Sequence, residues 1–327
     1  MPGAVTGPLE RVAGRDGDCS LTLQDGHEPT MQGGRVTSRN AERAMIGPHV
    51  NGLGMTGEAK GQKTFILGLG AQKTGTSWLY NYLASSGTVA THVIKEYHVW
   101  DALCIPGLGG LVVKEEDSET NFESRIRFFL QQSPENYFSY FAYMMHQQGK
   151  LATCDITPLY SGLDRKVLTL IREGFAQRGI ATKAVFLMRD PVERCWSSAR
   201  MDSRNKAGHT AVNDDEVLEH AMSRLSGLRT RYDTTVTETE APLAPSQVHF
   251  GIYEEMFEPA NIAKLSVFCR VSTRQGYSTR KSNVSEVTTP ISEFVYRRIA
   301  AHYREVYDFA ARRFPQTTEL WPGFRYL

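Results

Sequence analysis

Two glycines, one lysine and three hydroxyl side chains occur together in residues 70–78, Gly-Ala-Gln-Lys-Thr-Gly-Thr-Ser-Trp. This segment lies between the apolar run 64–69 and a run with helical spacing that begins at Leu79. A glycine-containing loop between a strand and a helix presents backbone N–H groups and the positive end of the helix dipole to an anion. These residues therefore predict a binding site for a phosphate-like group.

The loop departs at one position from the Walker A pattern G-x-x-x-x-G-K-[ST]. After Gly75 the expected lysine is replaced by Thr76, and the lysine of the loop is Lys73. In a nucleoside triphosphatase the missing lysine would reach the β- and γ-phosphates. The sequence therefore predicts a phosphate-like ligand that is not a triphosphate.

A second segment with phosphate-binding residues follows the apolar run 184–188. Arg189 comes first, and Pro191 suits the first turn of a helix, where its missing N–H needs no partner. Ser197 lies further along the same expected helix. An arginine fork fits phosphate oxygens and a serine hydroxyl adds a donor, so this junction also predicts phosphate binding.

Together the two segments resemble the donor-binding motifs of sulfotransferases, which use 3′-phosphoadenosine 5′-phosphosulfate (PAPS) as donor. Residues 70–78 are similar to the family loop G-x-x-K-x-G-T-[ST]-W, and residues 189–197 to R-D-P-x-x-R-x-x-S. The resemblance implies that Trp78 stacks on adenine, with an ordinary core tryptophan as the alternative. The other donor contacts that it implies are Lys73, Thr74, Gly75, Thr76 and Ser77 at the 5′-phosphosulfate, and Arg189 and Ser197 at the 3′-phosphate.

Residues 95–101, Lys-Glu-Tyr-His-Val-Trp-Asp, supply candidates for proton transfer. They resemble the K-E-x-H-x-x-D segment of heparan-sulfate-type sulfotransferases. This implies that Glu96 is the general base and that His98 and Asp101 support it. His98 is the alternative base, because imidazole titrates near neutral pH. The segment follows an expected strand, on the carboxyl side of the sheet where α/β folds place their sites.

Sulfuryl transfer sets two tasks for such a site. An acceptor oxygen or nitrogen attacks sulfur in line while the donor phosphate leaves, so the leaving oxygen needs a cation and the acceptor needs a base. Lys73 is the candidate for the first task and Glu96 for the second. No metal is expected, because no acidic set accompanies the phosphate loop.

Two further segments resemble the family less closely. Residues 154–160 are similar to the E-K-T-P-x-Y-F segment of the heparan-sulfate branch but lack its lysine, so that polysaccharide specificity is not expected. Thr157 and Tyr160 are candidates for the acceptor pocket, with a plain strand-end turn as the alternative. Arg280 and Lys281 are candidates for a basic loop over the 3′-phosphate, with an exposed basic turn as the alternative.

Strand-like and helix-like patterns alternate from Thr64 onward, which predicts an α/β fold: a P-loop NTPase-like parallel sheet flanked by helices, in a single domain over residues 62–327. Strands are expected at 64–69, 89–93, 151–156, 184–188 and 248–253. Besides the helix after Arg189, helices are expected at 77–84, 122–130, 134–145, 163–177, 214–225, 261–269 and 291–314. The polar stretch 203–213 is expected to separate two helices, and the polar stretch 234–246, which contains Pro242 and Pro245, is expected to be a loop.

Composition narrows the function classes. The 327 residues have a net charge of +1, which gives no global reason to expect nucleic acid or a membrane surface as partner. No apolar stretch reaches membrane-spanning length. Five dispersed cysteines without a C-x-x-C pair favour reduced thiols and hence a cytoplasmic location. Residues 1–61 are expected to be disordered, or to result from a mistaken upstream start, since Met45 and Met55 precede the first strand.

These patterns lead to one main hypothesis: a PAPS-dependent sulfotransferase acting on a hydroxyl, or less readily an amine, of a saccharide or small-molecule acceptor. A P-loop kinase or nucleotidase with an aberrant loop is the second hypothesis, and it predicts Mg²⁺-dependent ATP binding. The third is an inactive nucleotide-binding protein, which would bind adenosine 3′,5′-bisphosphate and transfer nothing. The sequence leaves the acceptor and the oligomeric state open.

Overall fold

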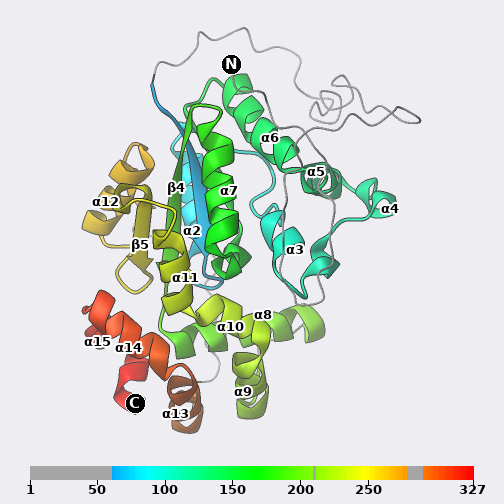
Figure 1. Cartoon of the computed structure of the whole chain (residues 1–327). Coiled ribbons are helices and arrows are strands. Elements are labelled where there is room, and N and C mark those ends of the chain that lie inside the picture. Colours follow the sequence, from blue (N-terminus) through cyan, green and yellow to red (C-terminus); the bar gives the residue numbers. More distant parts are fainter. Residues whose placement is uncertain (1–60, 209–210, 275, 278–289) are drawn as a thin grey trace.

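A five-stranded sheet is the centre of this computed structural model, which describes residues 61–208, 211–274, 276–277 and 290–327. Its strand order is β2-β3-β1-β4-β5, and every paired strand is parallel to its neighbour (Figure 1). The strands are β1 (Lys63–Gly70), β2 (Val89–Ala90), β3 (Ala152–Ile156), β4 (Ile180–Met188) and β5 (Val248–Ile252). The predicted α/β class with a parallel sheet flanked by helices is confirmed.

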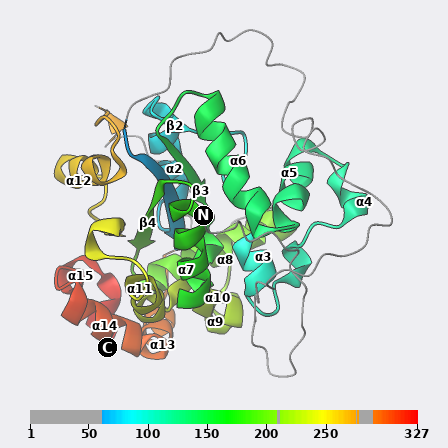
Figure 2. The same cartoon turned by 45° about the horizontal axis from the view of Figure 1, so that its top comes forward.

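Helices cover both faces of the sheet, because side chains of β1 alternate between two apolar cores. Phe65 and Leu67 belong to one core and Ile66 to the other. Helices α6 (Pro134–Gln147) and α7 (Arg165–Ala176) pack on the first face, and α2 (Thr76–Ser85) and α12 (Pro259–Cys269) pack on the second. Figure 2 shows α6 and α12 on opposite sides of the strands.

The other helices lie at the ends of the sheet or beyond its edges. Helices α3 (Trp100–Cys104), α4 (Glu115–Ser118) and α5 (Phe122–Gln131) follow β2 in the chain. Helix α8 (Pro191–Ala207) begins directly after β4 and lies near α9, α10 and α13 to α15, at the end of the sheet where β4 finishes (Figure 1). These last elements are α9 (Asp214–Met222), α10 (Arg224–Thr230), α13 (Glu293–His302), α14 (Arg304–Arg313) and α15 (Thr317–Leu320).

The loop expected at 234–246 is wrong. Residues 234–246 contain most of helix α11 (Tyr232–Glu240). Its threonines satisfy their hydroxyls inside the fold: Thr235 Oγ1 donates to Ser161 O at 2.7 Å, and Thr239 Oγ1 donates to Thr235 O at 2.7 Å. Residues 203–207, the start of the polar stretch expected to separate two helices, continue α8 to Ala207. A polar sequence is therefore compatible with a helix when its hydroxyls find carbonyl partners.

The expected single helix over 291–314 is also wrong. The structure has two helices there, α13 and α14, which meet at Tyr303. This side chain is buried, and its hydroxyl donates to Ala221 O at 2.6 Å. Because Tyr303 anchors the junction to α9, the chain breaks its helix there although the apolar spacing continues.

The described ranges contain four cysteines. Cys104, Cys154, Cys195 and Cys269 are free thiols. No helix in the described part of the chain is both long enough and apolar enough to cross a bilayer.

Candidate active site

The predicted site residues lie in the segments that leave the carboxyl ends of the strands. Lys73 follows β1, Glu96 follows β2 and Arg189 follows β4. In a parallel sheet these ends share one edge, and β1 is paired with both β3 and β4. The topology therefore brings three segments to the same edge of the sheet: the phosphate loop, the segment 95–101 that carries Glu96, and the turn between β4 and α8 that carries Arg189.

The phosphate loop, residues 71–75, holds its shape through its own backbone and hydroxyl groups. Thr74 is buried, and its Oγ1 donates to Ala71 O at 2.6 Å, while Ala71 N donates to Leu187 O of β4 at 2.9 Å. Gly75 caps helix α2 with φ at 93° and provides no side-chain cap. Since Leu79 N is the donor that reaches Gly75 O, the N–H groups before it have no partner within the helix. The loop thus offers amide donors to an anion.

Positive charge gathers around Lys73. Burial lowers the pKa of this ammonium below its ordinary value of 10.5, and three nearby guanidinium groups lower it further, those of Arg204, Arg189 and Arg200. Arg189 Nη1 lies 3.5 Å from Lys73 O, and its guanidinium carbon lies 4.7 Å from the centre of the Tyr253 ring. Carboxylates lie here too: Arg189 Nη2 is 3.1 Å from Glu193 Oε2, and Asp202 raises the pKa of Lys73. A ligand that carries several negative charges would be attracted by the cations of this group.

The corner that presents Arg189 is fixed by Asp190, which is fully buried. Asp190 Oδ1 caps helix α8 by accepting from Val192 N at 2.8 Å, and Oδ2 accepts from Gly323 N at 2.8 Å. Burial raises the pKa of this carboxyl to about 6 in spite of these donors. Tyr232 Oη also donates to Arg189 O at 2.9 Å. The guanidinium therefore projects from a backbone held on several sides.

Ser197 is half-buried on α8, the helix that this corner begins. The neighbouring Ser198 donates to Gln72 Oε1 at 2.9 Å and so joins α8 to the phosphate loop. This contact places the first turns of α8 beside the loop.

A second group of charges surrounds His98. Its Nδ1 lies 2.6 Å from Asp101 Oδ2, and its Nε2 lies 3.5 Å from Glu96 Oε2. Asp101 is fully buried, whereas about a third of the Glu96 side chain is exposed. The structure thus brings the three predicted residues together, with Glu96 as the accessible member.

The pKa values of this group follow from burial and contact. Burial lowers the pKa of His98, but hydrogen bonds to Asp101 and Glu96 more than reverse this and raise it to about 9. Burial raises the pKa of Glu96, but His98 and Lys95 bring it down to about 2. At neutral pH Glu96 is therefore an ionised proton acceptor, and His98 already carries its proton.

Lys95 connects the two groups of charge, and the sequence interpretation did not assign it a role. Its Nζ donates to Glu96 Oε1 at 2.6 Å and to Ser77 Oγ at 3.2 Å, and lies 3.4 Å from Thr76 Oγ1. It thus links the start of α2 with the candidate base. The sequence could have pointed to Lys95, because it is the first residue of the K-E-x-H-x-x-D segment in which Glu96 was identified.

Several of the predicted site residues are buried, and two lie outside the described residues. Trp78 is 1% exposed, stacks on Tyr82 with ring centres 5.0 Å apart and donates to Tyr277 O at 3.2 Å. Its faces are covered as in a core tryptophan, so we leave it out of the proposed donor contacts. Thr157 and Tyr160 are also fully buried rather than lining an open pocket. Arg280 and Lys281 lie outside the described residues.

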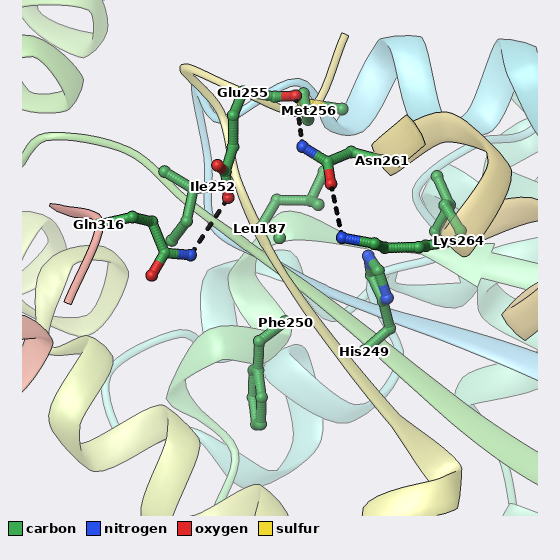
Figure 3. Close-up of a pocket in the computed structure, with 11 residues that line it drawn as sticks. Leu187, His249, Phe250, Ile252, Glu255, Met256, Asn261, Lys264 and Gln316 are labelled. Carbon is green, nitrogen blue, oxygen red and sulfur yellow. Dashed lines mark hydrogen bonds between the residues drawn. The ribbon is translucent and has the colours of Figure 1, made fainter. Parts of the chain in front are cut away.

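A cavity of about 170 Å³ lies beside β5 and α12 (Figure 3). Polar side chains line part of it: Lys264 Nζ donates to Asn261 Oδ1 at 3.3 Å, and Gln316 Nε2 donates to Glu255 Oε1 at 3.2 Å. The predicted donor and base residues are not among its lining residues, which are Leu187, His249, Phe250, Gly251, Ile252, Glu255, Met256, Asn261, Lys264, Leu265 and Gln316. The cations at the phosphate loop therefore do not line this cavity, although Leu187 of its lining accepts a hydrogen bond from Ala71 of the loop.

No set of three or more histidine, cysteine, aspartate or glutamate residues in the described ranges has the arrangement of a metal site.

Comparison by sequence gives no match to a protein-family model or to a curated protein.

Comparison by structure gives several matches. The chain is similar in fold to sulfotransferases. A sulfotransferase from Alicyclobacillus acidocaldarius is 17% identical over 77% of this chain and 96% of that one, with a TM-score of 0.49. The sulfotransferase domain of the Synechococcus PCC 7002 olefin synthase is 13% identical over 75% and 96%, with a TM-score of 0.40. The sulfotransferase domain from the curacin biosynthetic pathway is 15% identical over 76% and 99%, with a TM-score of 0.43.

Proposed function

We propose that this chain, through residues 62–327, transfers a sulfuryl group from PAPS to a hydroxyl group of a saccharide or small-molecule acceptor. The observation that carries the proposal is the group of cations around the phosphate loop, where three guanidinium groups act on Lys73. PAPS carries a 3′-phosphate and a 5′-phosphosulfate, so its charges match this group at both ends. We assign the 5′ end to Lys73 and the N–H groups of the loop, and the 3′-phosphate to Arg189 and Ser197.

The proposed reaction is an in-line displacement at sulfur. The acceptor oxygen forms a bond to sulfur while the bond from sulfur to the 5′-phosphate oxygen breaks, and that oxygen keeps the electron pair. Lys73 stabilises the charge on the leaving oxygen, and Glu96 takes the proton from the acceptor hydroxyl. His98, protonated and held by Asp101, stabilises the Glu96 carboxylate. The step as written requires no metal.

The alternatives are weaker on specific grounds. A kinase or nucleotidase of the P-loop type needs a lysine after Gly75, and Thr76 stands there. An inactive nucleotide-binding protein would have no use for an accessible carboxylate held beside the loop by Lys95. A cytoplasmic location, and the absence of nucleic acid among the partners, stay predictions.

Transfer of labelled sulfate from PAPS tests the proposal. The purified chain is incubated with PAPS carrying a radioactive sulfuryl group and with a panel of saccharides, phenols and aliphatic alcohols. We expect labelled product with at least one acceptor class, and no product with Lys73→Ala. Phosphoryl transfer from Mg²⁺-ATP, with no sulfuryl transfer to any acceptor, would overturn the proposal.

A further inference from the structure

Asp155, at the carboxyl end of β3, is fully buried and accepts three side-chain hydroxyl groups. Its Oδ2 accepts from Tyr137 Oη at 2.9 Å and from Tyr160 Oη at 2.9 Å, and its Oδ1 accepts from Thr157 Oγ1 at 2.6 Å. Burial raises the pKa of this carboxyl to about 6 although the three hydroxyl groups lower it. At neutral pH it is therefore an anion that needs these donors.

Two of the three hydroxyl groups also hold the segment that carries the candidate base. Thr157 Oγ1 accepts from Tyr97 N at 3.0 Å, and Tyr160 Oη accepts from Val99 N at 3.3 Å. A hydroxyl has one proton, and because that proton points at Asp155, the oxygen lone pairs are left for the amides. The carboxylate thus sets the direction in which both hydroxyl groups accept.

The residue between these two amides is His98. It has a φ of 51°, in the left-handed region that residues with a Cβ rarely adopt. Such a conformation persists where the surroundings fix the backbone on both sides. Here it lets the two ring nitrogens face Asp101 and Glu96.

We propose that Asp155 is a positioning residue, which orients the hydroxyl groups of Thr157 and Tyr160 and through them holds the His98 backbone so that His98 bridges Glu96 and Asp101. The positioning itself is a property of this chain whatever its reaction. Its consequence for catalysis rests on the proposed function, because there it presents Glu96 to the acceptor.

Two tyrosine variants separate positioning from a general loss of hydrogen bonds. Tyr160→Phe removes a hydroxyl that bonds both Asp155 and Val99 N, whereas Tyr137→Phe removes a hydroxyl that donates to Asp155 at the same 2.9 Å distance from helix α6. Both rings are fully buried, so the two changes are matched in size and burial. The readout is the titration of the His98 imidazole by NMR, assigned with His98→Gln.

We expect the pKa of His98 to fall by about one unit or more towards its ordinary value of 6.5 in Tyr160→Phe and to stay near 9 in Tyr137→Phe. Thr157→Val, which removes the other bridging hydroxyl, should give the same fall and serves if Tyr160→Phe does not fold. An equal fall in both tyrosine variants, or no fall in the bridging ones, would overturn the proposal.

Activity separates this proposal from the proposed function. With an acceptor found, Tyr160→Phe should lower kcat about 10-fold or more and leave the affinity for adenosine 3′,5′-bisphosphate unchanged. A fall in the pKa of His98 without any sulfuryl transfer would support the positioning role and count against the proposed function. Sulfuryl transfer at full rate in Tyr160→Phe, with an unchanged pKa of His98, would support the proposed function and count against the positioning role.

Discussion

Lys73 has the most demanding role among the single residues, since it is the cation assigned to the leaving oxygen. Removal of one preorganised donor from such a position lowers the rate by about 100-fold or more. We therefore expect Lys73→Ala to abolish measurable sulfuryl transfer, in the labelled-sulfate assay, while the chain still folds. Lys264→Ala is the control, because Lys264 lines the cavity beside β5 and is not among the assigned donor contacts. A Lys73→Ala variant that keeps more than a small fraction of the activity would remove Lys73 from the mechanism.

Lys95, together with His98, keeps the pKa of Glu96 low. The pKa of Glu96 is about 2 because the contacts with His98 and Lys95 outweigh the effect of burial. We expect Lys95→Ala to raise this pKa towards its ordinary value of 4.5, and Lys95→Arg to leave it low, as measured by carbon-13 NMR of the carboxyl group.

Lys95→Ala should also change the stability of the chain in acid. A carboxyl with a depressed pKa contributes stability that is present above about pH 4.5 and is lost as the pH falls through 2. Lys95→Ala should therefore lose less stability than the wild type between these two pH values. An unchanged titration of Glu96 in Lys95→Ala would show that the lysine does not act on it.

The contribution of His98 to folding stability depends on pH in the opposite direction. Its pKa is raised from 6.5 to about 9 in the folded chain, so its stabilising contribution is complete below about pH 6.5 and is lost as the pH rises through 9. The shift corresponds to about 3 kcal/mol. Urea unfolding at pH 6 and pH 9.5 should show this loss in the wild type and not in His98→Gln.

The pH profile of activity distinguishes the two candidate bases. If Glu96 is the base and protonated His98 supports it, kcat/KM should be level near neutral pH and fall above about pH 9. If His98 is the base, kcat/KM should rise up to about pH 9, because only the neutral imidazole accepts a proton. The proposed mechanism requires the first profile, and the second would reassign the base.

Single residues also show how far the sequence could predict the site. Arg200 and Arg204 were missed although they lie three and seven positions after Ser197, on the same side of a helix. That spacing could have pointed to them. The burial of Trp78 could not be predicted, because stacking on a base and packing in the core need the same apolar ring at the same helical position.

Strands were easier to predict than helices at the level of elements. All five strands were located, and the signal was clearest for β1 and β4, which contain the continuous apolar runs of buried parallel strands, although β4 begins at Ile180, before the predicted start. Helix α11 and the break at Tyr303 were missed because each depends on contacts far along the chain: Thr235 with Ser161, and Tyr303 with Ala221. Periodicity within a segment carries no information about such partners.

The phosphate loop depends on glycine at its last position. Gly75 has φ at 93°, and a Cβ added there would lie 2.8 Å from Met256 Sδ. We expect Gly75→Ala to cost about 1–2 kcal/mol from the backbone conformation alone and to weaken the binding of adenosine 3′,5′-bisphosphate. Gly87→Ala is a matched control, because Gly87 has φ at 71° but open space around it. Urea unfolding and calorimetry measure the two effects, and equal binding in both variants would contradict this role of the loop.

The whole molecule has a net charge of only +1, yet three guanidinium groups act on Lys73 at one edge of the sheet. Composition therefore does not reveal the site, and the order of the strands does. With β1 paired to β3 and β4, loops that are more than a hundred residues apart in the chain meet there. The fold class and the edge of the sheet were predictable from motifs at strand ends, whereas the distances between the motifs needed the fold.

We propose that this edge of the sheet binds the donor of a sulfuryl group rather than a nucleoside triphosphate. Calorimetric titration of the purified chain without Mg²⁺, first with adenosine 3′,5′-bisphosphate and then with ATP, tests it most directly. We expect micromolar binding of the bisphosphate, much weaker binding of ATP, and loss of bisphosphate binding in Arg189→Ala. No binding of the bisphosphate, together with tight ATP binding once Mg²⁺ is added, would contradict it.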